Sequence, residues 1–347
     1  MIQENKLKPG DKLMTESEFQ KLYNVSRHTV RQALNYLENE GIIYKEQGLG
    51  SFVAEPKAKK KIKEIGVITT FISDYIFPNI IQGIEEELTK AGYSMILTST
   101  NNDIDLEKKA LEIMIDRPID GLIVEPTKSS YYNPNLGLYL KLKEKGIPII
   151  MINAKYEELD FPQVVLNDYK ASFDLTKHLV EQNHTKVGGI FKVDDRQGKE
   201  RLKGFIQACY KFGIEILSDN VFVYETGNLD NVLKEVEEKM IRDKKVTGIV
   251  CYNDKVATDL LRIIWKSNYK VPDDFSIVSH DNSNLSTISE VRITGIDHPK
   301  NKLGKKAAQT LLNYIKNKSG TMETTVFDGE LILYDSVKRI EELNGEE

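Results

Sequence analysis

The sequence contains very little cysteine. Cys209 and Cys251 are the only two cysteines among 347 residues, and each stands in an otherwise apolar segment. We therefore expect buried free thiols, as in a reducing cytoplasm, with neither a structural disulfide nor a zinc site. Histidine is also sparse: its five copies, at positions 28, 178, 184, 280 and 298, lack the spacing of metal ligands, and we predict no metal site.

Long apolar runs are also absent. No stretch approaches the roughly 20 apolar residues of a membrane span, and Gln3 to Lys6 are polar rather than the start of a signal peptide. We therefore expect a cytoplasmic protein with no membrane partner. Three common glycine motifs are missing. The first strand of the large region is not followed by the dinucleotide motif Gly-x-Gly-x-x-Gly, and the chain lacks the NTPase motif Gly-x-x-x-x-Gly-Lys-Ser/Thr and the hydrolase motif Gly-x-Ser-x-Gly. Their absence excludes the commonest sites of these three classes.

Length and charge indicate more than one folded unit. A chain of 347 residues with 40% apolar residues exceeds what one hydrophobic core usually serves. The net charge is −5, but residues 1–60 carry ten Lys and Arg against eight Asp and Glu, so the excess of acids lies in the remainder. Any attraction to a polyanion must therefore be local to the first region.

The first region has the pattern of two short helices. Thr15 and Glu18 form a capping-box pattern that predicts a helix start at Thr15, with Phe19, Leu22 and Tyr23 on its apolar face. A second helix should be capped by Ser26. Its spacing turns one set of side chains inward and another outward: Val30, Ala33, Leu34 and Leu37 inward, and Arg27, His28, Arg31 and Gln32 outward.

A glycine-rich hairpin follows the second helix. Gly41 should end the helix as a left-handed cap, and two β-type runs at 42–44 and 51–53 flank the turn 47–50. A charged helix alone is usually just a solvated face. The ordered set of turn, cap, charged helix and hairpin instead predicts a small α+β winged helix-turn-helix, whose second helix enters a DNA major groove.

These motifs resemble the DNA-binding domain of the GntR family of bacterial transcription factors, notably in Lys8-Pro9-Gly10-Asp11, in Val25 to Leu34 and in Gly48 to Val53. The resemblance implies that double-stranded operator DNA is contacted by Glu16, Ser26, Arg27, His28, Thr29, Arg31, Gln47 and Gly48. Glu16 also has a purely structural alternative, because it lies in the capped turn. The family normally begins with a further helix, which we expect to be largely missing here, leaving Val30, Leu34 and Leu37 partly exposed.

The rest of the chain alternates apolar strands with amphipathic helices. Strands are expected at 65–69, 95–98, 121–124, 149–152, 187–191, 248–251 and 275–278. This alternation predicts an α/β fold with parallel sheets, helices on both faces and two lobes. The basic segment 56–63 should be a linker between the two domains.

Polar and aromatic side chains follow several of these strands, where ligands of parallel sheets bind. Tyr75, Phe77, Glu125 and Asn153 are examples, and their mixture of flat rings, carboxylates and amides suits a sugar. Each one alone is more often a turn or capping residue. A catalytic set of Glu125, Asp281 and His298 is conceivable, but nothing else in the sequence supports an enzyme, and we predict no catalytic residue and no cofactor.

From Ile65 onward the chain resembles the sugar-sensing domain of the LacI/GalR family and related periplasmic binding proteins. The resemblance is carried by Gly83-Ile84-Glu85, Ile119 to Ile123, Arg201-x-x-Gly204-Phe205, Tyr252-Asn253-Asp254 and Val271 to Val278. It implies a periplasmic-binding-protein-like domain, a sugar cleft between lobes joined by three crossovers, and a homodimer. The implied sugar-binding residues are Tyr75, Phe77, Glu125, Asn153, Gln197, Arg201, Asn253, Asp281 and His298.

The expected domains are therefore 1–55 for DNA binding, 56–63 for the linker and 64–347 for sugar binding and dimerisation. Lobe N should comprise 64–165 and 293–325, and lobe C 166–292 and 326–347. The pairing of a GntR-type with a LacI-type region is similar to that of the arabinose-responsive repressors of Gram-positive bacteria. It implies a repressor dimer that leaves its operator when a monosaccharide, most simply L-arabinose, binds. A regulator of another pentose or hexose and a non-regulatory sugar-binding protein are the alternatives.

Overall fold

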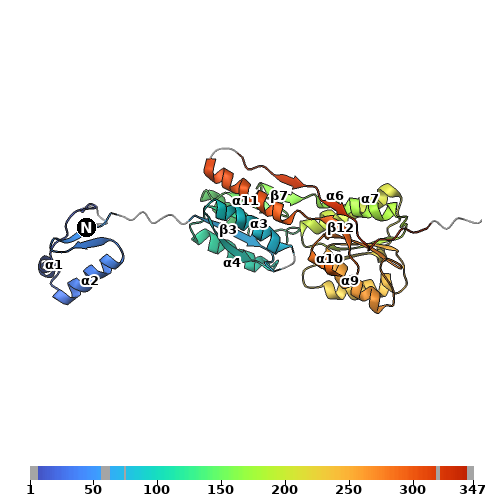
Figure 1. The fold of residues 1–347 in the computed structure, drawn as a ribbon, viewed down its shortest axis with the longest axis horizontal. Coiled ribbons are helices and arrows are strands. Elements are labelled where there is room, and N and C mark those ends of the chain that lie inside the picture. Colours follow the sequence, from blue (N-terminus) through green and yellow to red (C-terminus); the bar gives the residue numbers. More distant parts are fainter. Residues whose placement is uncertain (1–6, 56–62, 74–75, 318–320, 342–347) are drawn as a thin grey trace, which may run out of the picture. The chain divides into compact units, whose positions relative to one another are not determined.

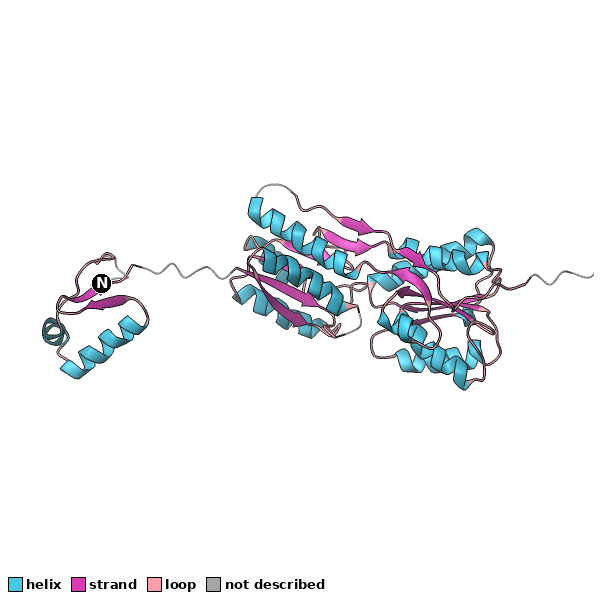
Figure 2. Cartoon of the chain, viewed as in Figure 1, coloured by secondary structure: helices cyan, strands magenta, loops and turns pink. Residues whose placement is uncertain are grey.

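The computed structural model describes residues 7–55, 63–73, 76–317 and 321–341. The chain folds as two compact units, a small unit of Met1–Ile62 and a large unit of Lys63–Glu347. Figure 2 shows that both units combine helices with strands. The expected linker, 56–63, lies outside the described residues except for Lys63. Within the described ranges, no helix combines the length and apolar character needed to cross a membrane.

The small unit has two helices followed by a hairpin. Its elements are α1 (Glu16–Tyr23), α2 (Arg27–Asn39), β1 (Ile43–Glu46) and β2 (Gly50–Val53), and the two strands pair antiparallel. Both predicted caps are confirmed. Thr15 and Glu18 bond reciprocally at the start of α1, and the Ser26 hydroxyl accepts from the Thr29 backbone N–H at 3.1 Å. The helix-turn-helix and the wing therefore form where the sequence predicts them.

The core of the small unit is more complete than expected. Val30 and Leu34 are 5% and 6% exposed, because Ile43 and Val53 of the hairpin pack against them. The prediction that these two helix residues would be partly exposed is wrong, whereas Leu37 is indeed only partly buried. The hairpin thus covers most of the apolar stripe of α2.

Three other side chains of this unit are more exposed than predicted. Ala33 is exposed because the hairpin covers only the side of α2 that carries Val30 and Leu34. On α1 only Phe19 packs partly against the core, while Leu22 and Tyr23 are more than half exposed. The apolar face predicted for α1 is therefore reduced to a single position.

Lobe N of the large unit is built on a six-stranded parallel sheet in the order β13-β7-β6-β5-β3-β4. Its strands are β3 (Glu64–Thr69), β4 (Ser94–Ser99), β5 (Gly121–Val124), β6 (Ile149–Ile152), β7 (Gln163–Leu166) and β13 (Thr325–Phe327). Its helices are α3 (Phe77–Lys90), α4 (Ile104–Asp116), α5 (Leu136–Glu144) and α11 (Lys300–Asn317).

Lobe C repeats this design with the strand order β14-β12-β11-β10-β8-β9, in which only β14 runs antiparallel to its neighbour. Its strands are β8 (Val187–Lys192), β9 (Val221–Tyr224), β10 (Gly248–Cys251), β11 (Ser276–Asp281), β12 (Thr294–Asp297) and β14 (Glu330–Ile332). Its helices are α6 (Asp168–Glu181), α7 (Arg196–Phe212), α8 (Leu229–Val236), α9 (Asp254–Lys266) and α10 (Asn284–Ile288), with short turns η1 (Ser218–Asn220) and η2 (Glu237–Ile241). Both cysteines are buried and free, as expected.

The chain passes between the lobes three times, as the sequence implied. The crossings lie between β7 and α6, between β12 and α11, and between β13 and β14. The second crossing differs from the expected boundary at residue 293, because β12 (294–297) pairs with β11 and so belongs to lobe C. The third lies after Phe327 rather than at 325, since β13 pairs with β7. Neither strand has a long apolar run that would have marked its place.

Each lobe has a pair of tightly packed helices, α3 with α11 in lobe N and α6 with α7 in lobe C (Figure 1). Glycine permits both contacts. A Cβ on Gly83 would lie 2.3 Å from the Asn301 carbonyl oxygen, and one on Gly204 would lie 2.2 Å from the Tyr169 carbonyl oxygen. Gly204 of the Arg201-x-x-Gly204 motif therefore serves helix packing.

We expect Gly204→Ala to destabilise the large unit by about 1–3 kcal/mol, because the new methyl group meets the backbone of α6 and forces the two helices apart. The control is Gly137→Ala in α5, where a Cβ meets nothing within 4 Å and alanine favours the helix. Urea unfolding followed by the fluorescence of the single tryptophan, Trp265, measures both variants. Equal midpoints for Gly204→Ala and the wild type would contradict the close contact.

Candidate effector pocket and DNA-reading surface

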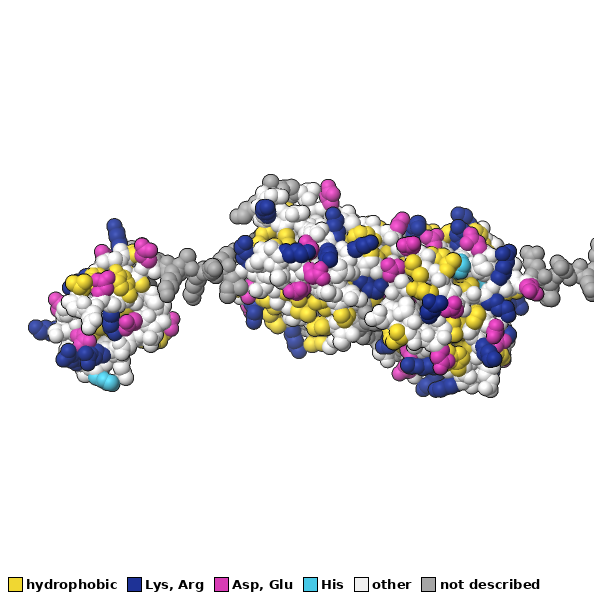
Figure 3. Space-filling model, in the orientation of Figure 1, with side chains coloured by type: hydrophobic (Ala, Val, Ile, Leu, Met, Phe, Trp, Pro, Cys, Tyr) yellow, Lys and Arg dark blue, Asp and Glu magenta, His cyan; other side chains and the backbone are white. Residues whose placement is uncertain are grey.

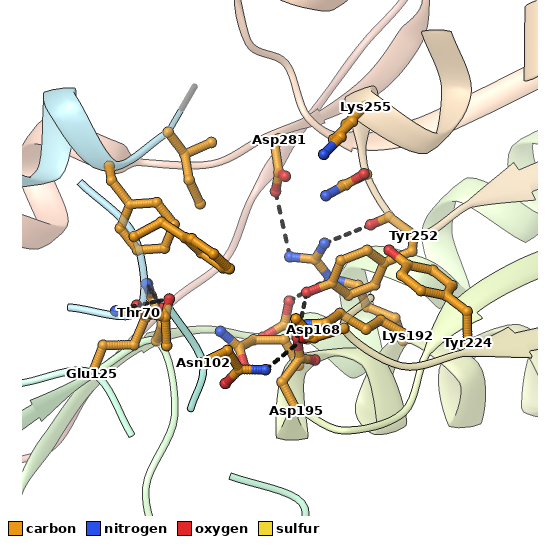
Figure 4. A pocket seen from close by; sticks show the side chains of 18 of the residues that line it. Thr70, Asn102, Glu125, Asp168, Lys192, Asp195, Tyr224, Tyr252, Lys255 and Asp281 are labelled. Atoms are coloured by element: carbon orange, nitrogen blue, oxygen red, sulfur yellow. Dashed lines mark hydrogen bonds and ion pairs between the residues drawn. The ribbon is translucent and has the colours of Figure 1, made fainter. Parts of the chain in front are cut away.

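A cavity of about 190 Å³ lies between the two lobes, at the carboxyl ends of strands from both sheets. In lobe N, Thr70 and Glu125 follow β3 and β5, and in lobe C, Tyr252 follows β10 and Asp281 ends β11. Figure 4 shows these side chains around one common space. This edge is where open α/β sheets bind their ligands, because the strand-to-helix turns of both lobes converge there.

Most of the predicted sugar-binding residues come together in this cavity. Those that line it are Phe77, Glu125, Asn153, Gln197, Arg201, Asn253, Asp281 and His298. The ninth, Tyr75, lies outside the described residues. The chain therefore gathers residues more than 200 positions apart around one space, and their role as sugar ligands stays a prediction.

Arg201 of α7 links several parts of the pocket wall. Its Nε donates to Asp168 Oδ1 at 2.8 Å, its Nη1 to the Tyr252 carbonyl at 2.6 Å, and its Nη2 to Asp281 Oδ1 at 3.4 Å. Burial alone would lower the pKa of Arg201, but the two carboxylates raise it, so the guanidinium stays charged. The guanidinium also lies over the Tyr252 ring, 4.9 Å from its centre.

Glu125 forms the corresponding polar group in lobe N. Its Oε2 accepts from the Thr70 backbone N–H at 2.9 Å and from the Thr70 hydroxyl at 2.5 Å, and its Oε1 accepts from Asn153 Nδ2 at 2.8 Å. The residue is 3% exposed, and burial raises its pKa. These bonds hold the carboxyl group and the amide of Asn153 in fixed positions beside the cavity.

Three buried polar atoms of the pocket residues find no hydrogen-bond partner among the residues that the structure describes. They are Asn153 Oδ1, Gln197 Oε1 and His298 Nδ1. A buried polar atom without a partner costs about 1–3 kcal/mol. The two amide oxygens can only accept a hydrogen bond, so they favour a ligand that carries hydroxyl donors.

The two histidines near the pocket are neutral around pH 7. Burial lowers the pKa of His298 to about 4 and that of His280 to about 3. His280 does not line the cavity, and its Nδ1 lies 3.1 Å from the Cys251 carbonyl oxygen. A neutral His298 can bond a hydroxyl, but its pKa is too low for an efficient general base at neutral pH. Within the described ranges, no three His, Cys, Asp or Glu side chains gather as a metal site requires.

Several lining residues were not among the predicted ones, including Thr70, Asn102, Asp168, Asp195 and Tyr224. Asp168 and Tyr224 adjoin β7 and β9, two strands that the sequence did not predict. Asp195 caps α7 by accepting from the Gly198 backbone N–H at 2.7 Å. An aspartate directly before a helical pattern was a usable N-cap signal.

The small unit presents the predicted DNA-contacting residues on its surface. All of them are exposed except the partly buried Glu16, and Figure 3 shows basic side chains and a histidine gathered at one end of this unit. Glu16 Oε2 accepts from Arg27 Nε and Oε1 accepts from Arg31 Nε, both at 3.0 Å. These bonds with Arg27 and Arg31 lower the pKa of Glu16. The Glu16 carboxylate therefore orients two arginines of α2. In the wing, Gly48 adopts a left-handed φ of 82° at the turn between β1 and β2.

Comparison with protein families matches two separate parts of the chain. Residues 1–53 match the bacterial regulatory proteins of the gntR family. Residues 176–337 match the periplasmic binding protein-like domain. The first match covers the small unit, and the second covers most of lobe C together with α11.

Two relatives match the chain along most of its length, across both of these parts. The chain is 44% identical to the arabinose metabolism transcriptional repressor of Geobacillus stearothermophilus, over 96% of this chain and 93% of the relative. It is equally identical to the repressor of the same name from Halalkalibacterium halodurans, over 89% of this chain and 84% of the relative.

Solved structures share the fold. A LacI family transcriptional regulator from Enterococcus faecium with bound ribose has a TM-score of 0.68 at 23% identity, covering 80% of this chain and 100% of the other. The transcriptional regulator CelR in complex with cellobiose has a TM-score of 0.70 at 17% identity, covering 93% and 100%.

The buried His298 should make stability depend on pH. Its pKa is about 4 in the folded chain and about 6.5 when unfolded, so the unfolded state takes up the proton first as the pH falls. Its contribution is complete above pH 6.5 and is lost between pH 6.5 and 4. Between pH 7.5 and 5.0 the wild type should lose about 2 kcal/mol more than His298→Gln, as measured by urea unfolding at each pH. Parallel pH curves for the two proteins would show that His298 titrates normally.

Proposed function

The chain belongs to the arabinose metabolism transcriptional repressor family, and from that membership we propose a specific way of working. A homodimer binds a pseudo-palindromic operator through its two small units, and L-arabinose binding in the inter-lobe pocket releases it. The protein performs no catalysis and needs no cofactor. Such a regulator acts on chromosomal DNA, so the cytoplasm is the location that this function requires.

The observation that carries the proposal is the chemistry of the inter-lobe cavity. Aromatic rings of Phe77, Tyr224 and Tyr252 line it together with carboxylates and amides, and unpartnered acceptors on Asn153 and Gln197 favour hydroxyl donors. Its volume of about 190 Å³ is below the range of roughly 300–1,000 Å³ of pockets for drug-sized ligands. A single sugar ring suits both its size and its polarity.

The charges around the cavity favour a neutral sugar over an acid or a phosphate ester. The Lys192 ammonium lies 3.0 Å from Asp195 Oδ2, and Arg201 is bonded to Asp168 and Asp281. The charges of these two buried cations are therefore already compensated by carboxylates. An anionic ligand would meet Glu125 and these carboxylates, and Lys255, the described lining cation outside these pairs, is exposed to water and so offsets them weakly.

We assign the ligand contacts residue by residue. The sugar contacts are Tyr75, Phe77, Glu125, Asn153, Gln197, Arg201, Asn253, Asp281 and His298, and the DNA contacts are Ser26, Arg27, His28, Thr29, Arg31, Gln47 and Gly48, with Glu16 orienting Arg27 and Arg31. Sugar and operator DNA bind at different sites, but each lowers the affinity of the protein for the other. A coupling free energy of about 1–3 kcal/mol changes operator affinity by about 5-fold to 150-fold.

L-arabinose should bind the full chain and release it from DNA, whereas L-arabinonate, its oxidised acid, should bind about 100-fold more weakly because it is negatively charged. Isothermal titration calorimetry measures both ligands, with D-ribose and D-xylose as comparisons. DNA release is measured by fluorescence anisotropy on duplexes that the full chain enriches from a random-sequence pool. Preferential binding of another sugar would overturn the ligand assignment, and sugar binding without a change in DNA affinity would overturn the mechanism.

Arg31→Ala should weaken DNA binding and reduce the slope of log K against log salt by about 1, because one phosphate contact and its released counterion are lost. Arg262→Ala is the matched control, since it removes the same charge from an exposed residue of α9 in the large unit. Anisotropy titrations at several salt concentrations give both slopes. Identical losses in the two variants would mean that net charge, rather than the α2 surface, attracts DNA.

A further inference from the structure

The side chain of Asn102 joins the two lobes beside the effector pocket. It lies in the turn between β4 and α4 of lobe N and is 2% exposed. Its Nδ2 donates to Asp194 Oδ2 at 3.0 Å and to Thr226 Oγ1 at 2.7 Å, both in lobe C. Its Oδ1 accepts from the Lys128 backbone N–H at 2.8 Å, within lobe N. Three protein partners therefore satisfy the amide without any contribution from a ligand.

The backbone around this amide is left-handed. Asn101 and Asn102 have φ angles of 48° and 56°, and Lys128, which bonds to Asn102, has a φ of 43°. Left-handed residues other than glycine are uncommon, but asparagine adopts this region more readily than most residues. The turn can therefore hold the conformation that places the Asn102 side chain against lobe C.

A chain of ionic and hydrogen-bonding contacts connects Asn102 to the pocket wall. The Lys192 ammonium lies 3.3 Å from Asp194 Oδ1 and 3.0 Å from Asp195 Oδ2. Asp195 Oδ2 in turn accepts from the Tyr252 hydroxyl at 2.7 Å. Figure 4 shows Asn102, Lys192, Asp195 and Tyr252 grouped on one side of the cavity. The contact between the lobes and the proposed sugar site therefore share their charged groups.

Further contacts between the lobes lie nearer the surface. The Tyr131 hydroxyl donates to Glu225 Oε1 at 2.8 Å, the Arg196 backbone N–H donates to the Ser129 hydroxyl at 2.9 Å, and Lys199 Nζ donates to the Ser130 carbonyl at 3.0 Å. Contacts that involve exposed side chains are weakened by competition with water. The bond of Asn102 to Asp194 joins two buried side chains and is protected from that competition, whereas its bond to Thr226 is only partly buried because Thr226 is exposed.

We propose that Asn102 is the positioning residue of a latch that holds the lobes together and sets how long a bound sugar stays in the pocket. A sugar enclosed between the lobes can leave only when they separate, and separation must break the bonds from Asn102 to Asp194 and Thr226. The effect on sugar residence rests on the proposed function, whereas the latch itself is a property of the protein alone. Its loss favours the open form and increases the dissociation rate.

A matched pair of glycine variants isolates the side chain. Asn102→Gly removes the latch amide, and Asn101→Gly removes its neighbour, which is exposed and bonds within its own turn to Ser99. Glycine tolerates the positive φ at both positions, so neither variant strains the turn. The two proteins therefore differ in whether the bonds between the lobes are lost, and because Asn102 also lines the cavity, a measurement without sugar is needed to separate the latch from a direct contact with the ligand.

The first measurement uses the full chain without sugar. The Arg196 amide is protected by the Ser129 hydroxyl of the other lobe, so its hydrogen exchange reports separation of the lobes. We expect exchange of this amide to be about 10-fold faster in Asn102→Gly and unchanged in Asn101→Gly. Unchanged exchange in Asn102→Gly would overturn the latch, whether or not any sugar binds.

The second measurement follows L-arabinose by stopped-flow fluorescence. In Asn102→Gly the dissociation rate should rise about 10-fold while the association rate stays the same or increases. Thr226→Val, which removes the partner in lobe C, should act similarly, and combining it with Asn102→Gly should add much less than the sum of the two effects. Additive effects would overturn the latch, because they would indicate two independent contacts with the sugar. Failure of the wild type to bind L-arabinose would instead count against the proposed function.

Discussion

The buried charge of Arg201 is the constraint around which the pocket is organised. A guanidinium that is 4% exposed persists only where carboxylates and carbonyls compensate for the lost water. Its partners stand at three separate places: Asp168 just after the first crossing between the lobes, Tyr252 after β10 and Asp281 at the end of β11. The ion cluster therefore ties the entry of the chain into lobe C to the strand ends that line the cavity. Loss of the Arg201 cation would leave the Asp168 and Asp281 carboxylates buried close together. The geometry of the pocket wall therefore depends on Arg201.

Much of the fold could be predicted because parallel strands are buried on both faces. β5, β6 and β10 are fully buried, and each appears in the sequence as an uninterrupted run of apolar residues and glycine. The same logic placed Glu125, Asn153 and Asp281 correctly at the edge of the cavity, since the carboxyl ends of parallel strands meet at one edge. The sequence thus determines the inner strands and, through them, most of the candidate site.

The features that could not be predicted lie on strands with a weaker apolar pattern and in contacts between the lobes. β13 and β14 have only three residues each, β7 and β12 include polar residues, and β9 is only half buried, so none of them has the continuous buried run of β5, β6 and β10. Asp168 and Tyr224 adjoin two of these strands and were therefore missed. Asn102 could not be identified either, because its partners in lobe C are 92 and 124 residues away. In the small unit, periodicity alone could not tell which side of α2 the hairpin would cover, so Ala33 was placed inside.

Several residues at the cavity have unusual backbone conformations that depend on polar partners. Non-glycine residues with positive φ are found among the residues that line the cavity, namely Asn102, Asn153 and Asp281. Such conformations are costly and need neighbouring bonds to hold them. Glu125 holds Asn153, and Arg201 contacts Asp281, so each strained residue depends on a polar partner at the same cavity. A ligand that bonds these groups, or a motion that separates the lobes, changes the same set of contacts.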